Sequence, residues 1–411
     1  MQYLDFLGLS YSANSNQAVA LFEQVMESYL QFKPDTMAKL NSLTEQEMVS
    51  PMAQILKSYL LKMGSDPRLT AIIKKCLKWL SNTELNHREN LHLDALKNWL
   101  NDDIDTALGR FELILDTYPT DIIALKAAHN LYFYKGDAES MHRSVARVLP
   151  AWEEHSWKGY VLGLYSFGLE ESGHYQRAEA TGREAVILNP NDLWAAHAVT
   201  HVCQMQSRWQ DGLNWLNERI PGWTDTNNFV YHLHWHEALL HLSSGDNDAA
   251  LDIYDQVLTE PLQDDLYLDV CNAASMLWRL QMRGYDVTAR WRALQQWQHR
   301  ATDNELIFIT LHYLMAPAVL NDAPAVKQAL EAIRTWGERS GRQASICKTI
   351  GLKTAEAIVE LGQARTISGI KKLKQVQDRL YTIGGSHAQR QLFSDLIRHY
   401  SEPPLNSEPD I

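Results

Sequence analysis

Apolar residues recur every three to four positions in almost every segment longer than ten residues. Gly and Pro stand between these segments, and the strict alternation of apolar and polar residues that marks a half-buried strand is nearly absent. A helical period places such apolar residues on one face of a helix. The pattern therefore predicts an all-α protein made of amphipathic helices.

One stretch, residues 160–192, shows how these helices are paired. Gly173 follows a first apolar segment, the small residues Ala178 and Ala185 lie in a second, and Pro190 closes the unit. Glycine permits a tight turn, small side chains let two helices approach closely, and proline cannot continue a helix. These residues follow the tetratricopeptide pattern, a repeat of about 34 residues that forms a helical hairpin.

The turn position of this unit recurs along the chain. Its first equivalents stand at Asp102, Gly136, Gly173, Ser207 and Gly245, with spacings of 34, 37, 34 and 38 residues. Later turns, in longer and degenerate units, are expected at Gly284, Asp322 and Gly362. The pattern therefore predicts a superhelix, or α-solenoid, of degenerate tetratricopeptide-like helical hairpins that shares one core along the chain.

The two ends of the chain lack this signature. Helices without it are expected at residues 15–30, 44–63 and 66–80, interrupted at Lys33-Pro34 and at Gly64. The last eleven residues combine Pro, Ser and acidic side chains with little apolar surface, which is typical of disorder. The expected regions are an N-terminal helical cap (1–82), the repeats (83–382), a C-terminal helix (383–400) and a disordered tail (401–411).

Composition narrows the classes of partner. The 411 residues carry 38 Lys+Arg and 50 Asp+Glu, a formal net charge of -12. The largest basic cluster is the short run at residues 371–374, so neither nucleic acid nor an anionic membrane is an expected partner. The start has no secretory pattern, and no apolar stretch approaches the length of a membrane span, which predicts a cytoplasmic protein. An oligomer remains an open alternative.

The cysteines do not indicate a metal site or a disulfide framework. Four of them are scattered through helical sequence without a Cys-x-x-Cys pair: Cys76, Cys203, Cys271 and Cys347. We expect them to be reduced and mostly buried.

Two histidine pairs are the main candidates for chemistry. The first helix of each hairpin lines the concave wall of such a superhelix, and His197 and His201 share the inner face of one first helix. At a spacing of four residues, their Cβ atoms lie roughly 6 Å apart, close enough to bind one metal ion, share a proton or grip an anion. His232 and His236 repeat this spacing in the first helix of the next hairpin. His232 occupies an inner-face position of the repeat, whereas His236 lies one residue away from such a position. That the four imidazoles meet is a hypothesis.

Other inner-face residues extend this candidate site. Glu170-Glu171 is interpreted as a solvated helix end with one carboxylate turned inward. Gly384-Gly385 is expected to be a turn that opens the last helix, where a helix start favours an anion. Aromatic, amide, carboxylate, guanidinium and imidazole groups complete the candidate set: His129, Asn130, Tyr134, Tyr160, Phe167, Glu170, Trp194, Gln204, Trp235, Arg279, His312, His387 and Arg390.

Four motifs carry a resemblance to a known family. They are Ala124-Leu125-Lys126-x-Ala128-His129-x3-Phe133-Tyr134, residues 165–169 (Tyr-Ser-Phe-Gly-Leu), His197-x3-His201, and Gly384-Gly385-Ser386-x-Ala388-Gln389-Arg390. With them the chain resembles the tetratricopeptide repeat protein 38 family from about residue 90 to residue 399. The resemblance implies a compactly closed solenoid, with histidines and arginines at the candidate positions above. It implies no particular activity.

Three departures from that family pattern bear on chemistry. Gln204 and Asn272 stand where the family typically carries carboxylates, and His387 stands where related sequences can carry Asn. Amides keep size and hydrogen bonding, but they cannot act as charged ligands of a hard cation or as acid/base groups. Metal or acid/base chemistry through Gln204 and Asn272 is therefore in doubt, and the alternatives are that this protein binds a different ligand or binds one without turning it over.

Two functional hypotheses follow. The leading one is a protein that binds a peptide segment or a small metabolite in a histidine-rich concave pocket, with Trp194, Trp235 and Phe167 as aromatic anchors. The alternative is an enzyme in which the four histidines are metal ligands or acid/base groups and Arg279 or Arg390 orients an anionic substrate. The cofactor is unknown, and a divalent metal is an alternative that the sequence does not favour.

Overall fold

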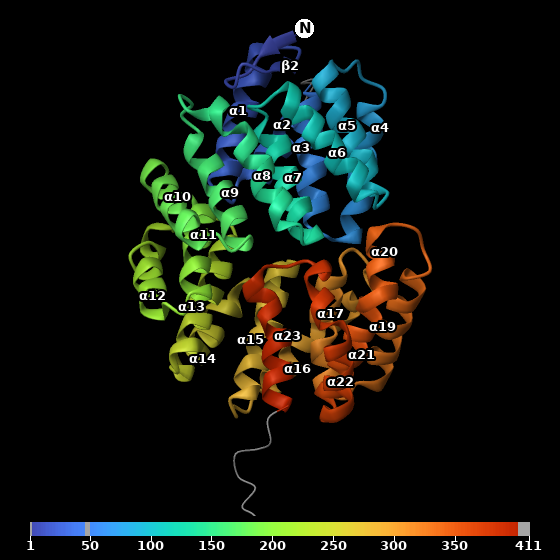
Figure 1. Ribbon diagram of the computed structural model, residues 1–411. Helices are drawn as coiled ribbons and strands as arrows, with labels where there is room; N and C mark the ends of the chain where they lie inside the picture. The colour runs from blue at the N-terminus through green and yellow to red at the C-terminus, as the bar shows by residue number, and fades with distance from the viewer. Residues whose placement is uncertain (1, 46–49, 402–411) are drawn as a thin grey trace, which may run out of the picture. The chain divides into compact units, whose positions relative to one another are not determined.

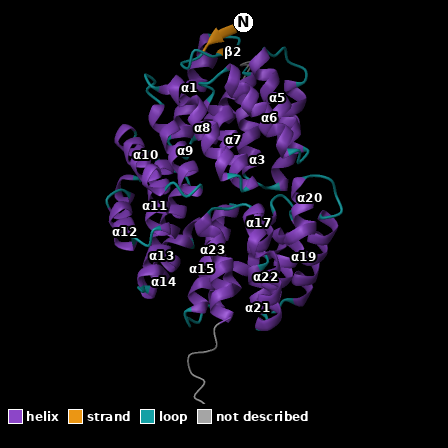
Figure 2. Ribbon diagram, in the orientation of Figure 1, coloured by secondary structure: helices purple, strands orange, loops and turns teal. Residues whose placement is uncertain are grey.

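The structure of the protein is a computed structural model that describes residues 2–45 and 50–401 (Figure 1). Over this part of the chain, regular structure is helical apart from two short strands, which confirms the prediction of an all-α protein (Figure 2). None of the described helices is long and apolar enough to cross a membrane. The contacts within the chain define two compact units, Met1–Asp246 and Asn247–Ile411. The four cysteines are free and buried, as expected.

Unit 1, residues 1–246, begins with a small antiparallel hairpin in which Gln2 pairs with Ser12. Helices follow in pairs to the end of the unit. Its strands and α-helices are β1 (Gln2–Leu4), β2 (Ser10–Ser12), α1 (Asn16–Leu30), α2 (Thr36–Glu45), α3 (Pro51–Met63), α4 (Thr70–Leu80), α5 (His87–Leu100), α6 (Ile104–Thr117), α7 (Ile122–Lys135), α8 (Ala138–Val148), α9 (Lys158–Glu171), α10 (Tyr175–Leu188), α11 (Leu193–Met205), α12 (Trp209–Asn217) and α13 (Phe229–Ser244).

Unit 2, residues 247–411, continues with shorter and less regular helices. A π-helical segment (Tyr254–Leu258) extends its first helix, and a second (Cys347–Gly351) joins α20 to α21. Its α-helices are α14 (Asn247–Ile253), α15 (Tyr267–Met282), α16 (Thr288–Leu294), α17 (Ile307–Tyr313), α18 (Met315–Val319), α19 (Ala323–Trp336), α20 (Arg342–Ile346), α21 (Leu352–Gly362), α22 (Thr366–Val376) and α23 (His387–Ser401).

The turns of the repeat lie where the sequence pattern places them. Each expected turn residue from the first five units adopts left-handed backbone, with φ values of 58° at Asp102, 71° at Gly136, 79° at Gly173, 58° at Ser207 and 91° at Gly245. Such a residue ends one helix and lets the chain reverse into the next. The fold is therefore a tetratricopeptide-like series of helical hairpins, as predicted.

Two of the three later turns were predicted at the wrong residue. Gly284 is left-handed as expected, with φ 88°, but Asn321 rather than Asp322 takes that conformation in the next unit. Asp322 instead caps α19, because its carboxylate accepts a hydrogen bond from the backbone of Ala325. Gly362 ends α21, where an added Cβ would lie 2.7 Å from the backbone carbon of Ala318. That glycine serves helix packing, not the turn.

The expected helix over residues 44–63 is also wrong as a single element. α2 ends at Glu45 and α3 begins at Pro51, with Ser50 accepting a hydrogen bond from the backbone of Ala53 as its N-cap. The other two N-terminal helices are found as expected, the second with a short 3₁₀ turn before α4. α23 ends at Ser401. The rest of the predicted tail, residues 402–411, lies outside the described residues.

Small residues set the spacing of the helices around the site. Ala178 and Ala185 are fully buried, as the repeat pattern requires. An added Cβ at Gly168 of α9 would lie 2.8 Å from the Cα atom of His142 in α8. Likewise, a Cβ atom added at Gly182 of α10 would lie 2.7 Å from the side chain of Val199 in α11. These close approaches fix α9 and α11 relative to their neighbours.

Candidate functional site: a buried histidine and carboxylate cluster

The first helices of successive hairpins lie side by side in unit 1. α9 packs on both α7 and α11, and α11 packs on α13 (Figure 1). Asp192 starts α11 by accepting hydrogen bonds from the backbone of Trp194 and Ala195, at 3.0 and 3.2 Å. This cap determines where α11 begins, and the packing of α11 on α9 and α13 determines which of its faces is buried.

Four histidines of α11 and α13 meet in the interior of unit 1. The ring centroid of His197 lies 4.4 Å from that of His201, 5.1 Å from that of His232 and 5.0 Å from that of His236. His236 is also 4.5 Å from His201 and 4.9 Å from His232. We call these four residues the imidazole cluster. The structure thus brings together the two pairs whose meeting was a hypothesis.

The cluster is closed off from solvent. The exposed fractions are 2% for His197, 0% for His201, 4% for His232 and 0% for His236. Neither ring nitrogen of His197 has a hydrogen-bond partner among the described residues. Burial, followed by the nearby His201 and His232, holds the pKa of His197 well below its ordinary value. His197 is therefore a neutral imidazole with a lone pair available to a ligand.

Two carboxylates at the end of α9 adjoin the cluster. The Nδ1 atom of His201 lies 3.4 Å from Oε2 of Glu170 and 4.0 Å from Oε1 of Glu171. Both glutamates are buried, with exposed fractions of 0% and 7%. The interpretation of Glu170-Glu171 as a solvated helix end is therefore wrong. The last turn of α9 is covered because α8, α10 and α11 all pack against this helix.

Aromatic rings form the walls around the imidazoles. Phe167 of α9 stacks on His197 with centroids 5.3 Å apart, and Trp194 lies 5.2 Å from the same ring. Trp235 stacks nearly parallel to His232, at 5.2 Å and 13°. These walls restrict the imidazoles and exclude water, which strengthens any polar interaction made inside.

His129 belongs to the edge of this site. Its ring on α7 lies 5.9 Å from Phe167 and 5.8 Å from Trp194. Burial, together with the charge of Lys126, lowers the pKa of His129 to about 3. It is a neutral, buried imidazole beyond the aromatic wall.

The N-terminal segment covers one side of the site. The ring of Phe32, just after α1, stacks on Phe229 at 4.9 Å, and Phe229 lies 5.3 Å from His197 and 5.5 Å from His232. The carbonyl of Phe32 accepts a hydrogen bond of 2.6 Å from the backbone of Asn227. Phe229 thus lies between the imidazole cluster and Phe32, which belongs to the α1–α2 connection.

The remaining candidates of unit 1 make contacts outside the cluster. Tyr134 packs its ring on Phe133, and Gln204 donates a hydrogen bond of 3.3 Å to the hydroxyl of Ser243. Tyr160 lies at the start of α9, where burial raises the pKa of its hydroxyl to about 12. Asn130 is half-buried on α7.

Within unit 2, the candidate residues lie near the start of α23. The guanidinium of Arg279 donates to the carbonyls of Ser275 and Ala388, at 3.2 and 3.1 Å. Nδ1 of His312 lies 2.8 Å from the carbonyl of Phe308, and burial lowers the pKa of His312 to about 4.

The predicted turn before α23 is confirmed. Gly384 and Gly385 have φ values of 92° and 83°. Ser386 and Gln389 cap the helix reciprocally, through Gln389 N to Ser386 Oγ at 3.2 Å and Ser386 N to Gln389 Oε1 at 2.8 Å. Arg390 donates to the carbonyl of Gly385, and His387 is the first residue of the helix. These contacts stabilise the helix start, and no anion is needed to explain them.

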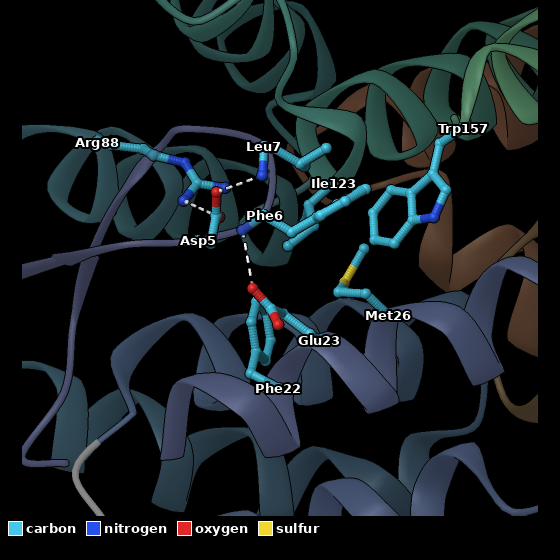
Figure 3. Close-up of a pocket in the computed structure, with 9 residues that line it drawn as sticks. All are labelled: Asp5, Phe6, Leu7, Phe22, Glu23, Met26, Arg88, Ile123 and Trp157. Carbon is cyan, nitrogen blue, oxygen red and sulfur yellow. Dashed lines mark hydrogen bonds and ion pairs between the residues drawn. The ribbon is translucent and has the colours of Figure 1, made fainter. Parts of the chain in front are cut away.

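Away from the imidazole cluster, a hollow lies beside the N-terminal hairpin (Figure 3). It holds about 280 Å³, including space open to solvent. Its polar groups pair with one another: Arg88 lies 3.5 Å from a carboxylate oxygen of Asp5, and the backbone of Phe6 donates to Glu23 at 2.8 Å. The buried guanidinium of Arg88 also contacts Asp121 at 2.6 Å. These contacts therefore anchor the N-terminal hairpin, and the charged side chains named here are paired within the protein.

Three residues of the site were missed by the sequence analysis. Glu171 was assigned to solvent, while Phe229 and Asp192 were not singled out. A signal existed for Asp192, because Asp followed by an apolar helix is a common N-cap pattern. Neither hydrophobic periodicity nor spacing distinguishes Phe229 from an ordinary core residue.

Comparison with known proteins adds little to this geometry. No protein-family model matches the chain. Among solved structures, it is similar to a tetratricopeptide repeat protein from Parabacteroides merdae, with 11% sequence identity and a TM-score of 0.39, over 77% of this chain and 99% of that one. The description of the fold therefore rests on the helices and turns themselves.

Proposed function

We propose that this protein is a helical-repeat binding protein whose unit 1 recognises a small polar ligand at the imidazole cluster. The observation that carries the proposal is the meeting of four buried imidazoles with Glu170, while the ring nitrogens of His197 lack hydrogen-bond partners among the described residues. Leaving a buried polar group unpaired costs about 1–3 kcal/mol. A bound polar ligand that pairs with these groups would offset that cost.

The burial of the cluster favours a small ligand over a peptide segment. A peptide needs an accessible strip of surface along several helices. The four histidines are at most 4% exposed, and the Phe32–Phe229 pair covers one side. Apolar walls with a few polar groups are typical of sites for an ion or a small metabolite, which supports a small ligand.

We further propose membership of the tetratricopeptide repeat protein 38 family. Two of the motifs that carry the resemblance supply residues of the cluster region, namely Phe167 and the His197–His201 pair. A third forms the capped start of α23. The acidic composition and the four free cysteines support a cytoplasmic protein.

An enzyme is the second candidate function. The observation in its favour is the contact of His201 with Glu170, because a carboxylate beside an imidazole orients it as a general base. Arg279 donates to two carbonyl groups and lies 4.0 Å from the carboxylate of Asp395, and Arg390 donates to the carbonyl of Gly385. These partners all belong to unit 2, and the role of the two arginines in orienting a substrate stays a prediction.

The proposed function is tested by comparing the native and denatured masses of the purified full chain. We expect a mass difference that disappears when His197 and His201 are both replaced by Ala. The matched control replaces His142 and His174, whose rings lie 5.6 Å apart outside the cluster, and it should keep the added mass. Circular dichroism checks that both variants are folded. The same added mass in all three proteins, or in none of them, would contradict the proposal.

A further inference from the structure

We propose that the small ligand is a divalent transition-metal ion, with zinc as the best match, bound by one ring nitrogen each from His197, His201 and His236. This inference rests on the proposed function, because it names the ligand of the same site. It concerns residues of α11 and α13 only, and both helices belong to unit 1.

The geometry of the three imidazoles carries the first step. One ring nitrogen from each of His197, His201 and His236 lies within 4.8 Å of the others. Tetrahedral zinc binds imidazole nitrogens at about 2.0–2.1 Å, which places two such nitrogens about 3.4 Å apart. Binding therefore requires torsional adjustments of the three side chains that bring their nitrogens closer together.

The surroundings of His201 indicate which of its nitrogens would bind the ion. Its Nδ1 atom lies 3.4 Å from Glu170 and 4.0 Å from Glu171, which leaves Nε2 for the metal. Histidines that bind metals commonly donate their other N–H to a carboxylate, which fixes the tautomer and raises the basicity of the ligand. Glu170 and Glu171 are therefore positioning residues in this site.

The carboxylates of Glu170 and Glu171 could also compensate the positive charge of a buried metal ion. Three neutral imidazoles leave the two positive charges of a buried metal ion uncompensated, and an uncompensated charge in the interior is costly. Glu170 and Glu171 place two buried carboxyl groups against the cluster. This arrangement matches the charge of one divalent ion.

The donor set selects the kind of metal. Imidazole nitrogens suit zinc, nickel, iron and copper, whereas calcium and magnesium prefer oxygen ligands. His232, with its ring 5.1 Å from that of His197 and 4.9 Å from that of His236, faces the same space. His232 would therefore contact whatever molecule occupies the fourth coordination position of the ion.

Metal binding is tested on the full chain after treatment with a chelator. Titration with zinc, followed by calorimetry, is expected to show one equivalent bound per chain. His201→Ala and His236→Ala should each weaken binding by about 100-fold or more, whereas the double His142→Ala, His174→Ala control should leave it unchanged. Zinc that binds equally well to the cluster variants would overturn the inference.

Glu170→Gln separates a positioning residue from a direct ligand. It should weaken binding by about 10–100-fold, as is typical for the partner of a metal-bound histidine. The visible absorption of the cobalt-substituted protein should keep the intensity of a four-coordinate ion, because the three nitrogen ligands remain. Loss of that intensity in Glu170→Gln would contradict the assignment of Glu170.

A measurement on the unmodified chain guards against variants that fail to fold. X-ray absorption of the zinc-loaded protein should show scattering from at least three imidazole rings, and fewer would overturn the inference. Failure of this inference also differs from failure of the proposed function. An organic added mass that depends on His197 and His201, in a chain that does not bind zinc, supports the proposed function and rules out the metal.

Discussion

Replacing Gly168 by Ala is expected to destabilise unit 1, while the same change at Gly109 is expected to stabilise it. Both glycines lie inside helices, so each gains about 1 kcal/mol of helix propensity as Ala. The new Cβ at Gly109 meets nothing within 4 Å. At Gly168 it lies 2.8 Å from the Cα atom and 3.0 Å from the backbone nitrogen of His142, well inside normal contact distance.

The size of the change in stability depends on which atoms must move to make room for the new Cβ atom. Backbone atoms of α8 cannot rotate away as a side chain can, so α8 and α9 must separate, at the upper end of the roughly 1–3 kcal/mol that overpacking costs. After the gain in propensity, Gly168→Ala should lose about 2 kcal/mol. Gly109→Ala should gain about 1 kcal/mol, a difference of about 3 kcal/mol between two identical substitutions.

Urea unfolding followed by circular dichroism measures this difference as a shift between the two midpoints. The zinc or ligand affinity gives a second readout, because Glu170 lies two residues beyond Gly168 and moves with α9. We expect weaker binding in Gly168→Ala and unchanged binding in Gly109→Ala. Equal midpoints for the two variants would refute the close approach of α8 and α9 on which the reasoning depends.

Three further predictions concern charge and access in unit 1. Asp121→Asn should destabilise the protein by about 3 kcal/mol, measured by urea unfolding, because it removes the closer of the two carboxylates that pair with the buried guanidinium of Arg88 and leaves only Asp5, at 3.5 Å. Burial raises the pKa of Asp192 to about 7, so its contribution to stability is complete below pH 4 and is lost as the pH rises to 7. Asp192→Asn keeps the N-cap but does not titrate. It should therefore reduce the slope of the free energy of unfolding against pH by up to about 1.4 kcal/mol per pH unit over this interval. An unchanged slope would contradict the raised pKa of Asp192. Phe32→Ala should speed the removal of bound zinc by a chelator several-fold, whereas an unchanged rate would show that this ring does not control access.

Most of the fold could be predicted from the sequence because the repeat is encoded locally. A helical period and a turn residue that tolerates left-handed backbone are properties of short segments, and all five expected turns from Asp102 to Gly245 have that conformation. The errors occur where two roles compete for one residue. Gly362 looks like a turn glycine, yet it is required by the backbone of Ala318 on a neighbouring helix, which no local pattern reveals.

The candidate site was predictable only in part. The spacing of His197 and His201 places both on one face of α11, so a pair could be expected. The convergence with α13 depends on the angle between two helices, which the spacing alone does not determine. Glu171 shows the same limit: two adjacent carboxylates at a helix end suggest solvent, and only the packing of α9 between its neighbours buries both.

The imidazole cluster and its two carboxylates come from three first helices in consecutive hairpins, between Glu170 and His236. The site therefore lies within two repeat lengths of chain, and its parts need no distant segment to find one another. Contacts of short sequence separation form quickly, since little loop entropy is lost in closing them. During synthesis from the N-terminus, these helices would emerge and pack before unit 2 was complete. A ligand present at that stage would meet a formed site and would stabilise a partly made chain against aggregation or degradation.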